Sequence, residues 1–415
     1  MFTYEEVIKI TKAKGIIGPR LKSITKISID SRTLKPAELF IPIKGKRYDG
    51  AAFIPEALKK GGVVLKVKDG LKALQKLAAY HRSKFKIPII GVTGSCGKTT
   101  TKDMIASILS QEMPTLKNEE NYNNEIGVPL TLLKLTKRHK AAIIEMAMQR
   151  LGEIKELAKI CKPTIAVVTN IGEAHLAFLK SKKNIAKAKS EIFYFLKRGD
   201  FAVINQDDEY FEHLKSKAKR KGAKIITFGL LEKAEVTPKE LRGIKLPIPG
   251  EHNIYNALAA IAVAKILKIK KSSIKKGLET FNPSSHRMHL IDLPRGIRII
   301  DDTYNANPSS MAAALKTLAH EFQVSGRKIA VLGDMLELGR STKAAHRRIL
   351  KLAQDLKIDK IFTIGKCWPN PSFKDQSKLL KNLKNFLKPH DIILFKGSRG
   401  MHLDAAVVEL ADTYV

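Results

Sequence analysis

One stretch constrains the fold of this chain more than any other: an apolar run at residues 87–92 leads into a glycine-containing loop at 93–99 and a helical pattern from Lys98. Glycines let backbone N–H groups turn toward phosphate oxygens, a lysine adds a mobile positive charge, and a hydroxyl after it can ligate Mg²⁺. The helix dipole favours the same anions. The alternative, a surface turn that contains Lys98, fits poorly with the polar run at 99–101. The stretch therefore predicts a nucleotide-phosphate loop, in a variant form because Val92 stands where a glycine is usual.

The charge of the chain is strongly positive. Over 415 residues, 75 Lys and Arg face 40 Asp and Glu, which gives a formal net charge of +35. Such an excess indicates anionic partners, such as nucleotides, nucleic acid or a lipid surface. The lysines are spread along the chain and concentrate only at residues 215–224. Because dispersed lysine with few interleaved aromatics is more typical of a solvated surface than of a nucleic-acid groove, we expect no stable nucleic-acid partner.

The cysteines and the N-terminus bear on the cellular location. Cys96, Cys161 and Cys367 lie far apart in the sequence and form no metal-ligand spacing or disulfide framework, which fits a reducing compartment. Residues 1–10 carry acidic side chains in place of an apolar signal core, and no apolar run approaches the length of a membrane span. We therefore expect a cytoplasmic protein without a membrane span.

Alternating apolar runs and amphipathic helical patterns predict an α/β fold with three domains. Residues 1–86 are expected to form a small mixed α/β domain, with strands at 24–29 and 39–43. Residues 87–282 are expected to form a central domain with a parallel sheet, and 283–415 a Rossmann-like, doubly wound domain. The strands expected in these two domains are 87–92, 141–145, 164–169, 201–204 and 225–228, then 296–300, 328–332, 360–364 and 391–395.

Functional side chains are expected where strands end, because ligands of parallel α/β sheets bind at the carboxyl ends of the strands. Glu145 ends one apolar run and could hold Mg²⁺ near the predicted phosphate loop, the alternative being an exposed acid. His175 and Lys189, taken alone, are more typical of packed or surface residues. In the last domain, the polar clusters at 301–308 and 396–399 both follow strands and favour a site.

Several motifs together resemble the Mur ligases, the ATP-dependent amide-forming enzymes of peptidoglycan precursor synthesis, and within them the branch that adds D-alanyl-D-alanine. The resemblance covers nearly the whole chain. Two features look specific to the branch: the pair Asn123-Asn124 and the run 304–308. The motifs that carry the resemblance are residues 93–99, 121–130, 170–176, 250–258, 301–308 and 331–339.

The resemblance implies an ATP-dependent carbon–nitrogen ligase that joins D-alanyl-D-alanine to UDP-N-acetylmuramoyl-tripeptide through an acyl phosphate. A carboxylate is a poor electrophile and carries the wrong charge to meet an amine, so its phosphorylation creates a leaving group and removes that charge. The enzyme then holds the amine and the acyl phosphate together. Domain 1–86 would receive the UDP end, 87–282 would bind ATP, and 283–415 would complete the ligase. The family also suggests a monomer with mobile domains.

The resemblance further implies two Mg²⁺ ions, which support phosphoryl transfer by neutralising charge. Thr99 and Glu145 would hold one ion, and His175 the other. A lysine at the position of Lys189 is carbamylated by CO₂ in this family, and its anionic carbamate supports the second ion. That chemistry requires a neutral amine, so burial should depress the pKa of Lys189. The side chains expected to be catalytic are Lys98, His175, Lys189 and Arg287.

Binding residues are carried over from the family in the same way. Domain closure would bring the C-terminal groups to ATP. Expected to bind ATP are Thr93, Gly94, Ser95, Cys96, Gly97, Lys98, Thr99, Asn253, Asn256, Arg287 and Asp302. Expected to bind the other substrates are Ser31, Arg32, Asn123, Asn124, Tyr304 and Asn305, the first two at the UDP end.

Two alternatives remain open at this point. The first is a sibling ligase that adds a single amino acid, or a relative of folylpolyglutamate synthase, which shares the loop, His175 and the modified lysine. The second is a basic ATPase that depends on nucleic acid, motivated by the +35 charge. The identity of the third residue of the acceptor peptide is not encoded in any of these motifs.

Overall fold

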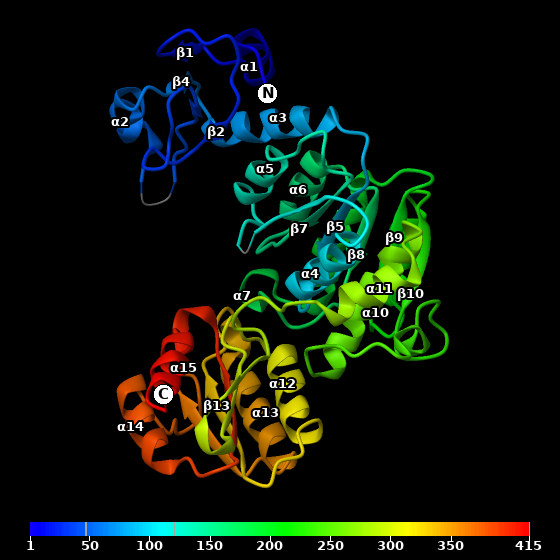
Figure 1. Cartoon of the computed structure of the whole chain (residues 1–415), viewed down its shortest axis with the longest axis vertical. Coiled ribbons are helices and arrows are strands. Elements are labelled where there is room, and N and C mark those ends of the chain that lie inside the picture. Colours follow the sequence, from blue (N-terminus) through cyan, green and yellow to red (C-terminus); the bar gives the residue numbers. More distant parts are fainter. Residues whose placement is uncertain (46–47, 120, 415) are drawn as a thin grey trace.

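Over the residues that the computed structural model describes, 1–45, 48–119 and 121–414, three β-sheets organise the chain (Figure 1). The N-terminal sheet lies at one end of the molecule, the central sheet follows, and the C-terminal sheet lies at the other end. The fold is therefore α/β with three sheets, as predicted. No helix of the described residues is long and apolar enough to cross a membrane.

The N-terminal sheet is mixed. Its order is β1 (Gly15–Ile17), β4 (Val63–Lys66), β3 (Leu39–Phe40) and β2 (Ile27–Ser28), and only the β1–β4 pair is antiparallel among the described pairs. The strands expected at 24–29 and 39–43 are both shorter than predicted, each with two residues in the sheet. Ile24 pairs instead with Phe2 in an isolated bridge. Its helices are α1 (Tyr4–Thr11), α2 (Ile54–Lys59), α3 (Gly70–Ser83) and the 3₁₀ turn Gly50–Phe53.

The central sheet is parallel throughout its described pairs. The expected strands are all present, within one or two residues. The short strand β6 was not predicted, because a three-residue edge strand carries no periodic signal. The order of the sheet is β10 (Lys224–Phe228), β9 (Phe201–Asn205), β8 (Ile165–Val168), β5 (Ile89–Thr93), β7 (Ala141–Glu145) and β6 (Thr115–Lys117).

Helices cover both faces of the central sheet, as the run of fully buried β5 residues requires. One face carries α5 (Gly127–Leu132), α6 (Glu153–Cys161), α8 (Lys182–Lys189) and α9 (Phe211–Lys219). The other face carries α4 (Lys98–Leu109), α10 (Glu251–Ile266) and α11 (Lys271–Glu279). The remaining elements are α7 (Leu176–Leu179) and the 3₁₀ turns Ser190–Phe195 and Pro238–Leu241.

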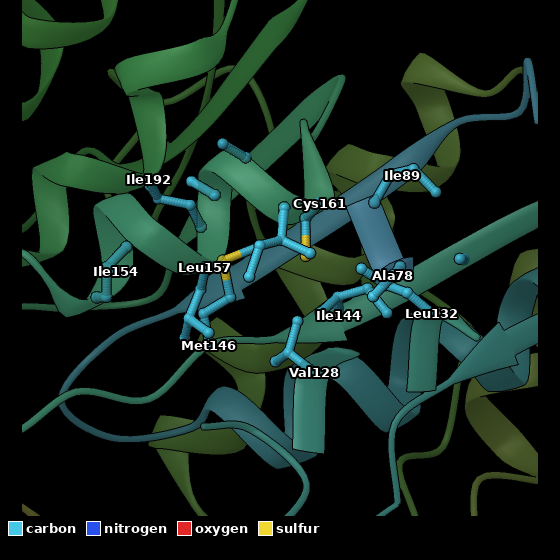
Figure 2. Close-up of a cluster of buried hydrophobic side chains, with 14 of the residues drawn as sticks. Ala78, Ile89, Val128, Leu132, Ile144, Met146, Ile154, Leu157, Cys161 and Ile192 are labelled. Carbon is cyan, nitrogen blue, oxygen red and sulfur yellow. The ribbon is translucent and has the colours of Figure 1, made fainter. Parts of the chain in front are cut away.

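Helix α3 shares the core of the central sheet. Figure 2 shows Ala78 of α3 in one buried cluster with Ile89 of β5 and with Val128 and Leu132 of α5. All four side chains are fully buried. Burial of apolar surface on this scale ties the N-terminal unit to the central sheet. The domain boundary at residue 86 stays a prediction.

The C-terminal sheet has helices on both faces, as expected for a doubly wound unit, but its edge strand β11 runs antiparallel to β12. That strand was not predicted. The order is β11 (His289–Asp292), β12 (Arg298–Asp301), β15 (Ile392–Lys396), β13 (Lys328–Gly333) and β14 (Lys360–Ile364). The helices are α12 (Pro308–His320) and α13 (Thr342–Asp355) on one face, α14 (Gln376–Phe386) and α15 (Leu403–Asp412) on the other, with 3₁₀ turns Pro294–Gly296, Gly339–Ser341 and Arg399–Met401.

Candidate active site

Residues that follow strands of the central and C-terminal sheets line one shared cavity. Its volume is ≈ 400 Å³. Most of the residues predicted to act on ATP, metal or substrate meet there, although the sequence positions of these residues range from Ser95 to Asn305. The predicted residues that line it are Ser95, Cys96, Gly97, Lys98, Thr99, Asn123, Glu145, His175, Asn253, Asn256, Arg287, Asp302, Tyr304 and Asn305.

The loop between β5 and α4 requires glycine at two positions. Gly94 and Gly97 have φ values of 156° and 78°. A Cβ atom would lie 1.8 Å from Thr169 Oγ1 at Gly94, and 2.1 Å from Asn256 Oδ1 at Gly97. The glycines thus allow the loop to pack closely against its neighbours while leaving the start of α4 open to the cavity. Gly97 is also the N-cap of α4, so the unpaired N–H groups of that helix begin here.

Lys98 holds its ammonium over this loop. Its Nζ donates hydrogen bonds to the carbonyl oxygens of Gly94 at 2.8 Å and Ser95 at 3.4 Å. Burial lowers the pKa of Lys98 from its ordinary value. A lysine held at a helix N-terminus fits the anion site that the sequence predicts, and that role stays a prediction.

Oxygen ligands gather beside the loop. Thr99 Oγ1 donates a hydrogen bond to Glu145 Oε2 at 2.8 Å, and Asn123 Nδ2 donates to Glu145 Oε1 at 2.8 Å. Glu145 is buried at the end of β7, so the reading as an exposed acid is wrong. Hydroxyl and carboxylate oxygens of this kind are the ligands that Mg²⁺ prefers, and the residues present therefore fit that ion.

Arg287 reaches this cluster from the C-terminal unit. Its Nη2 donates a hydrogen bond to Thr99 Oγ1 at 3.1 Å, and its guanidinium carbon lies 3.9 Å from the centre of the Tyr304 ring. The Nε of Arg287 is buried and has no hydrogen-bond partner among the described residues. A buried N–H without an acceptor is costly, so the arrangement suits an additional anionic acceptor in the cavity.

Lys189 lies behind the loop rather than in the cavity wall. It ends α8, and only 2% of its surface is exposed. Burial, and next the positive charge of Lys98, hold the pKa of Lys189 well below its ordinary value. The interpretation of Lys189 as a surface lysine is therefore wrong, and the lowered pKa favours the neutral amine that a carbamate requires.

His175 contacts the C-terminal unit. Its Nδ1 lies 2.7 Å from Glu337 Oε2. This hydrogen bond lowers the pKa of Glu337, which is therefore ionised at neutral pH. Glu337 was not predicted as a site residue, because only the tertiary fold brings β13 and β8 to the same place.

The side of the cavity that α10 provides is lined by the buried side-chain amides of Asn253 and Asn256. Asn256 Oδ1 accepts a hydrogen bond from Thr101 Oγ1 at 3.1 Å, and Asn256 Nδ2 donates to Asn253 Oδ1 at 3.0 Å. Asn253 in turn donates to the carbonyl oxygen of Pro249 at 2.6 Å. Burial lowers the pKa of the neighbouring His252 to about 4, so its ring is neutral. The two amides and this imidazole carry no charge, so they can bind a ligand only through hydrogen bonds between neutral groups.

The C-terminal wall includes Lys396, which belongs to the polar cluster 396–399 expected to favour a site but was not among the predicted binding residues. Lys396 Nζ forms an ion pair with Asp302 Oδ2 at 2.6 Å and donates to the carbonyl oxygen of Asn305 at 3.0 Å. The position of Lys396 at the end of a predicted strand is the signal that indicated a site at 396–399. Tyr304 donates its hydroxyl hydrogen to Asn121 Oδ1 of the central unit.

Other predicted site residues lie away from the cavity lining. Ser31 Oγ donates to Glu56 Oε2 at 2.7 Å, and Arg32 forms an ion pair with Asp30 at 2.8 Å, both in the N-terminal unit. Asn124 Oδ1 accepts from the N–H of Gly127 at 2.9 Å and so holds the start of α5. Thr93 donates to the carbonyl oxygen of Met146 at 2.9 Å. Their predicted roles stay predictions.

The glycine loop, its lysine, the adjoining acid and the arginine from a second unit define a class of protein: an enzyme that acts on a nucleoside triphosphate. Comparison with known families agrees with this class. The Mur ligase middle domain matches residues 92–264, the glutamate ligase domain of Mur ligases matches 286–399, and the catalytic domain of the Mur ligase family matches 23–131.

Relatives match over nearly the full length. The UDP-N-acetylmuramoyl-tripeptide–D-alanyl-D-alanine ligase of Bacillus subtilis (strain 168) is 35% identical, with 93% of each chain covered. The crystal structure of MurF from Acinetobacter baumannii is 32% identical, with a TM-score of 0.90 and 99% of each chain covered. MurF ligase from Thermotoga maritima, solved in complex with ADP, is 27% identical, with a TM-score of 0.82 and 94% and 97% of the two chains covered. The chain belongs to the Mur ligase family.

Proposed function

We infer that this chain is an ATP-dependent ligase that joins D-alanyl-D-alanine to UDP-N-acetylmuramoyl-tripeptide. Relatives named for this reaction match it over 93% of its length at 35% identity. The observation that carries the inference is the cavity where Lys98 and Glu145 of the central unit meet Arg287 of the C-terminal unit. A ligase needs this junction, because phosphoryl transfer and amide formation must occur without loss of the activated acid to water.

The proposed reaction has two steps, and positive charge in the cavity supports the first of them. The tripeptide carboxylate attacks the γ-phosphorus of ATP, and ADP leaves. The amine of D-alanyl-D-alanine then attacks the acyl carbon, and phosphate leaves with one oxygen of the original carboxylate. Lys98 and the amides at the start of α4 stabilise the phosphates, and Arg287 adds positive charge from the opposite side. Asn253 and Asn256 border the part of the cavity where we place the adenine.

We propose two Mg²⁺ positions. The oxygens of Thr99 and Glu145 fit the first, and the imidazole of His175 with a carbamate on Lys189 would hold the second. Bound there, the ions would neutralise the charge that develops on the transferred phosphoryl group. The low pKa of Lys189 supports the carbamate, because only the neutral amine can react with CO₂.

The other substrates are proposed to bind at both sides of the nucleotide. Asn123, Tyr304 and Asn305 line the cavity and are placed to hold the reacting ends of the peptide and dipeptide. Arg32, whose side chain is 83% exposed, is free on its outer side to meet a diphosphate at the UDP end, together with Ser31. All the residues proposed for the site lie in one chain, so we propose that the catalytic unit is a monomer. Because the proposed reaction uses ATP, we also propose that the protein acts in the cytoplasm.

Phosphate release from ATP and Mg²⁺ tests this function. The purified protein is assayed with UDP-N-acetylmuramoyl-tripeptide and either D-alanyl-D-alanine or single amino acids. We expect release that requires the dipeptide, with a pentapeptide product identified by mass. Release driven by a single amino acid would identify a sibling ligase, and release that requires nucleic acid would overturn the ligase assignment.

A further inference from the structure

Two short segments from different units meet beside the cavity. Residues 173–177 follow β8 of the central unit, and residues 337–339 follow β13 of the C-terminal unit. The N–H of Ala177 donates to the carbonyl oxygen of Glu337 at 3.0 Å, while the side chain of Glu337 contacts His175 Nδ1 at 2.7 Å. A Cβ atom on Gly339 would lie only 3.1 Å from Ala177 Cα. Glu337 thus contacts the central unit through both its backbone carbonyl oxygen and its side-chain carboxylate.

The backbone at this contact is unusual on both sides. His175 has a φ of 58° and Glu337 a φ of 62°, in the left-handed region that non-glycine residues seldom occupy. Residues held in such conformations persist where the surroundings fix them, and they concentrate at functional sites. Both residues combine a left-handed backbone with a side chain that contacts the other unit.

The hydrogen bond decides which nitrogen of His175 carries the proton. A carboxylate only accepts hydrogen bonds, so a neutral His175 must donate from Nδ1. Its Nε2 then keeps a free lone pair. Metal-binding histidines in proteins usually donate their second ring N–H to a carboxylate or carbonyl, which fixes both tautomer and ring orientation.

We propose that Glu337 is a positioning residue: across the junction of the two units it fixes His175 in the Nδ1–H tautomer, with Nε2 available to a divalent cation. The proposal rests on the proposed function, which supplies that cation. Because Glu337 belongs to the C-terminal unit, docking of that unit and readiness of His175 are coupled. Before the C-terminal unit docks, the cation site would be incomplete. A partly open enzyme would therefore hydrolyse little ATP.

The tautomer can be measured directly in full-length protein with ¹⁵N-labelled histidine at a pH where the imidazoles are neutral. His175→Gln identifies the His175 signals among the 11 histidines. We expect the Nδ1–H pattern in the wild type and the Nε2–H pattern in Glu337→Ala. Glu337→Gln should keep the wild-type pattern, because its amide oxygen can still accept the hydrogen. An unchanged tautomer in Glu337→Ala, or loss of the pattern in Glu337→Gln, would overturn the proposal.

A matched control separates positioning from simple docking. Arg348 of α13 forms an ion pair with Glu173 and thus joins segment 173–177 to the same C-terminal unit, with no hydrogen bond or ion pair to His175 among the described residues. Arg348→Met should leave the tautomer unchanged, and an effect equal to that of Glu337→Ala would contradict a specific role for Glu337. Binding of Mn²⁺ with a non-hydrolysable ATP analogue, followed by EPR, should weaken about 10–100-fold at one site in Glu337→Ala and not in Arg348→Met.

These readouts do not depend on turnover. If the tautomer follows Glu337 but phosphate release does not require D-alanyl-D-alanine, the proposed function fails and the positioning role stands. If ligation is observed and the tautomer ignores Glu337, the function stands and the positioning role fails.

Discussion

The central and C-terminal units present buried positive charge to the same cavity in opposite ways. In the central unit, Lys98 bonds to carbonyl oxygens and Lys189 is buried beside it, and neither forms an ion pair with a carboxylate of the described residues. In the C-terminal unit, Lys396 is equally buried but forms an ion pair with Asp302 at 2.6 Å. The central unit thus leaves Lys98 without a carboxylate partner, whereas the C-terminal unit neutralises Lys396 internally, although its Arg287 also keeps a buried N–H without an acceptor among the described residues.

This difference indicates separate tasks. A buried charge without a partner costs free energy of folding, so its retention points to a ligand of opposite charge. A buried pair costs less and fixes geometry, here the relative positions of the ends of β12 and β15. Lys98 is therefore placed to meet a phosphate, and the pair Lys396–Asp302 is placed to fix the C-terminal wall of the cavity. Removal of a lysine should consequently have opposite effects on stability in the two units.

The largest expected effect is on catalysis in the central unit. Lys98→Met should reduce phosphate release about 10³-fold, because a preorganised charge on the phosphates is lost. Its free energy of unfolding, measured in urea, should stay equal to that of the wild type or rise. The surface variant Lys159→Met serves as the control and should change neither quantity. Activity within tenfold of the wild type in Lys98→Met would break the comparison.

The next effect is on stability in the C-terminal unit. Lys396→Met leaves the partly buried Asp302 with only the N–H of Met288 as a partner and should lower the free energy of unfolding by about 3 kcal/mol. The double variant Asp302→Asn/Lys396→Met should recover much of this loss, because no unpaired charge remains. Urea denaturation measures both. A single variant as stable as the wild type would show that the pair does not hold this wall.

A smaller effect is expected of Lys189, whose lowered pKa makes the free energy of unfolding depend on pH. Its folded pKa lies below the ordinary 10.5, so as pH falls below 10.5 the unfolded chain takes up a proton before the folded chain does. Wild-type stability therefore falls with decreasing pH until the lowered pKa is reached. In CO₂-free buffer at pH 7, Lys189→Met should raise Tm by about 2–4 °C, the shift that 1 kcal/mol produces.

The pH series supplies the check on Lys189. The difference in Tm between Lys189→Met and the wild type should shrink as pH rises through 10.5, above which the lysine is mostly neutral in both the folded and the unfolded chain. A difference that stays constant over the whole range would assign the effect to packing instead. Added bicarbonate should stabilise the wild type alone if the carbamate forms.

The smallest expected effect is at the junction of the two units. The pair Arg348–Glu173 is largely exposed on the arginine side, and such pairs contribute about 0–1 kcal/mol. Arg348→Met should therefore lower the free energy of unfolding by about 0.5 kcal/mol, and less at high salt. A loss above about 2 kcal/mol would mean that the junction is held by charge rather than by the contacts of Glu337.

Local features of this molecule could be predicted from the sequence, and long-range pairings could not. The loop at 93–99, the strand ending at Glu145 and the start of α4 follow from adjacent residues, and the structure has them as predicted. The fully buried strands also give continuous apolar runs. In contrast, β6 and β11 are short edge strands with little periodicity, and both were missed.

The same limit applies to the site. His175 and Lys189 became candidates only through the family resemblance, because burial of a lysine has no local sequence signal. The pairs Glu337–His175 and Lys396–Asp302 join residues 162 and 94 positions apart, so only the fold reveals them. Cys367 likewise lies with Asp334 and His346 within 4.8 Å, although its sequence neighbours indicate nothing. There the carboxylate of Asp334 already accepts the N–H groups of Lys366 and Cys367 and holds the loop after β14.

The most direct test of the central claim follows one oxygen atom. The terminal carboxylate of UDP-N-acetylmuramoyl-tripeptide is labelled with ¹⁸O, and the reaction is run with ATP, Mg²⁺ and D-alanyl-D-alanine. Mass spectrometry of the released phosphate should find one ¹⁸O atom per phosphate, because the acyl phosphate transfers a carboxylate oxygen. Unlabelled phosphate would show that water cleaves ATP, and it would contradict a cavity built for ligation.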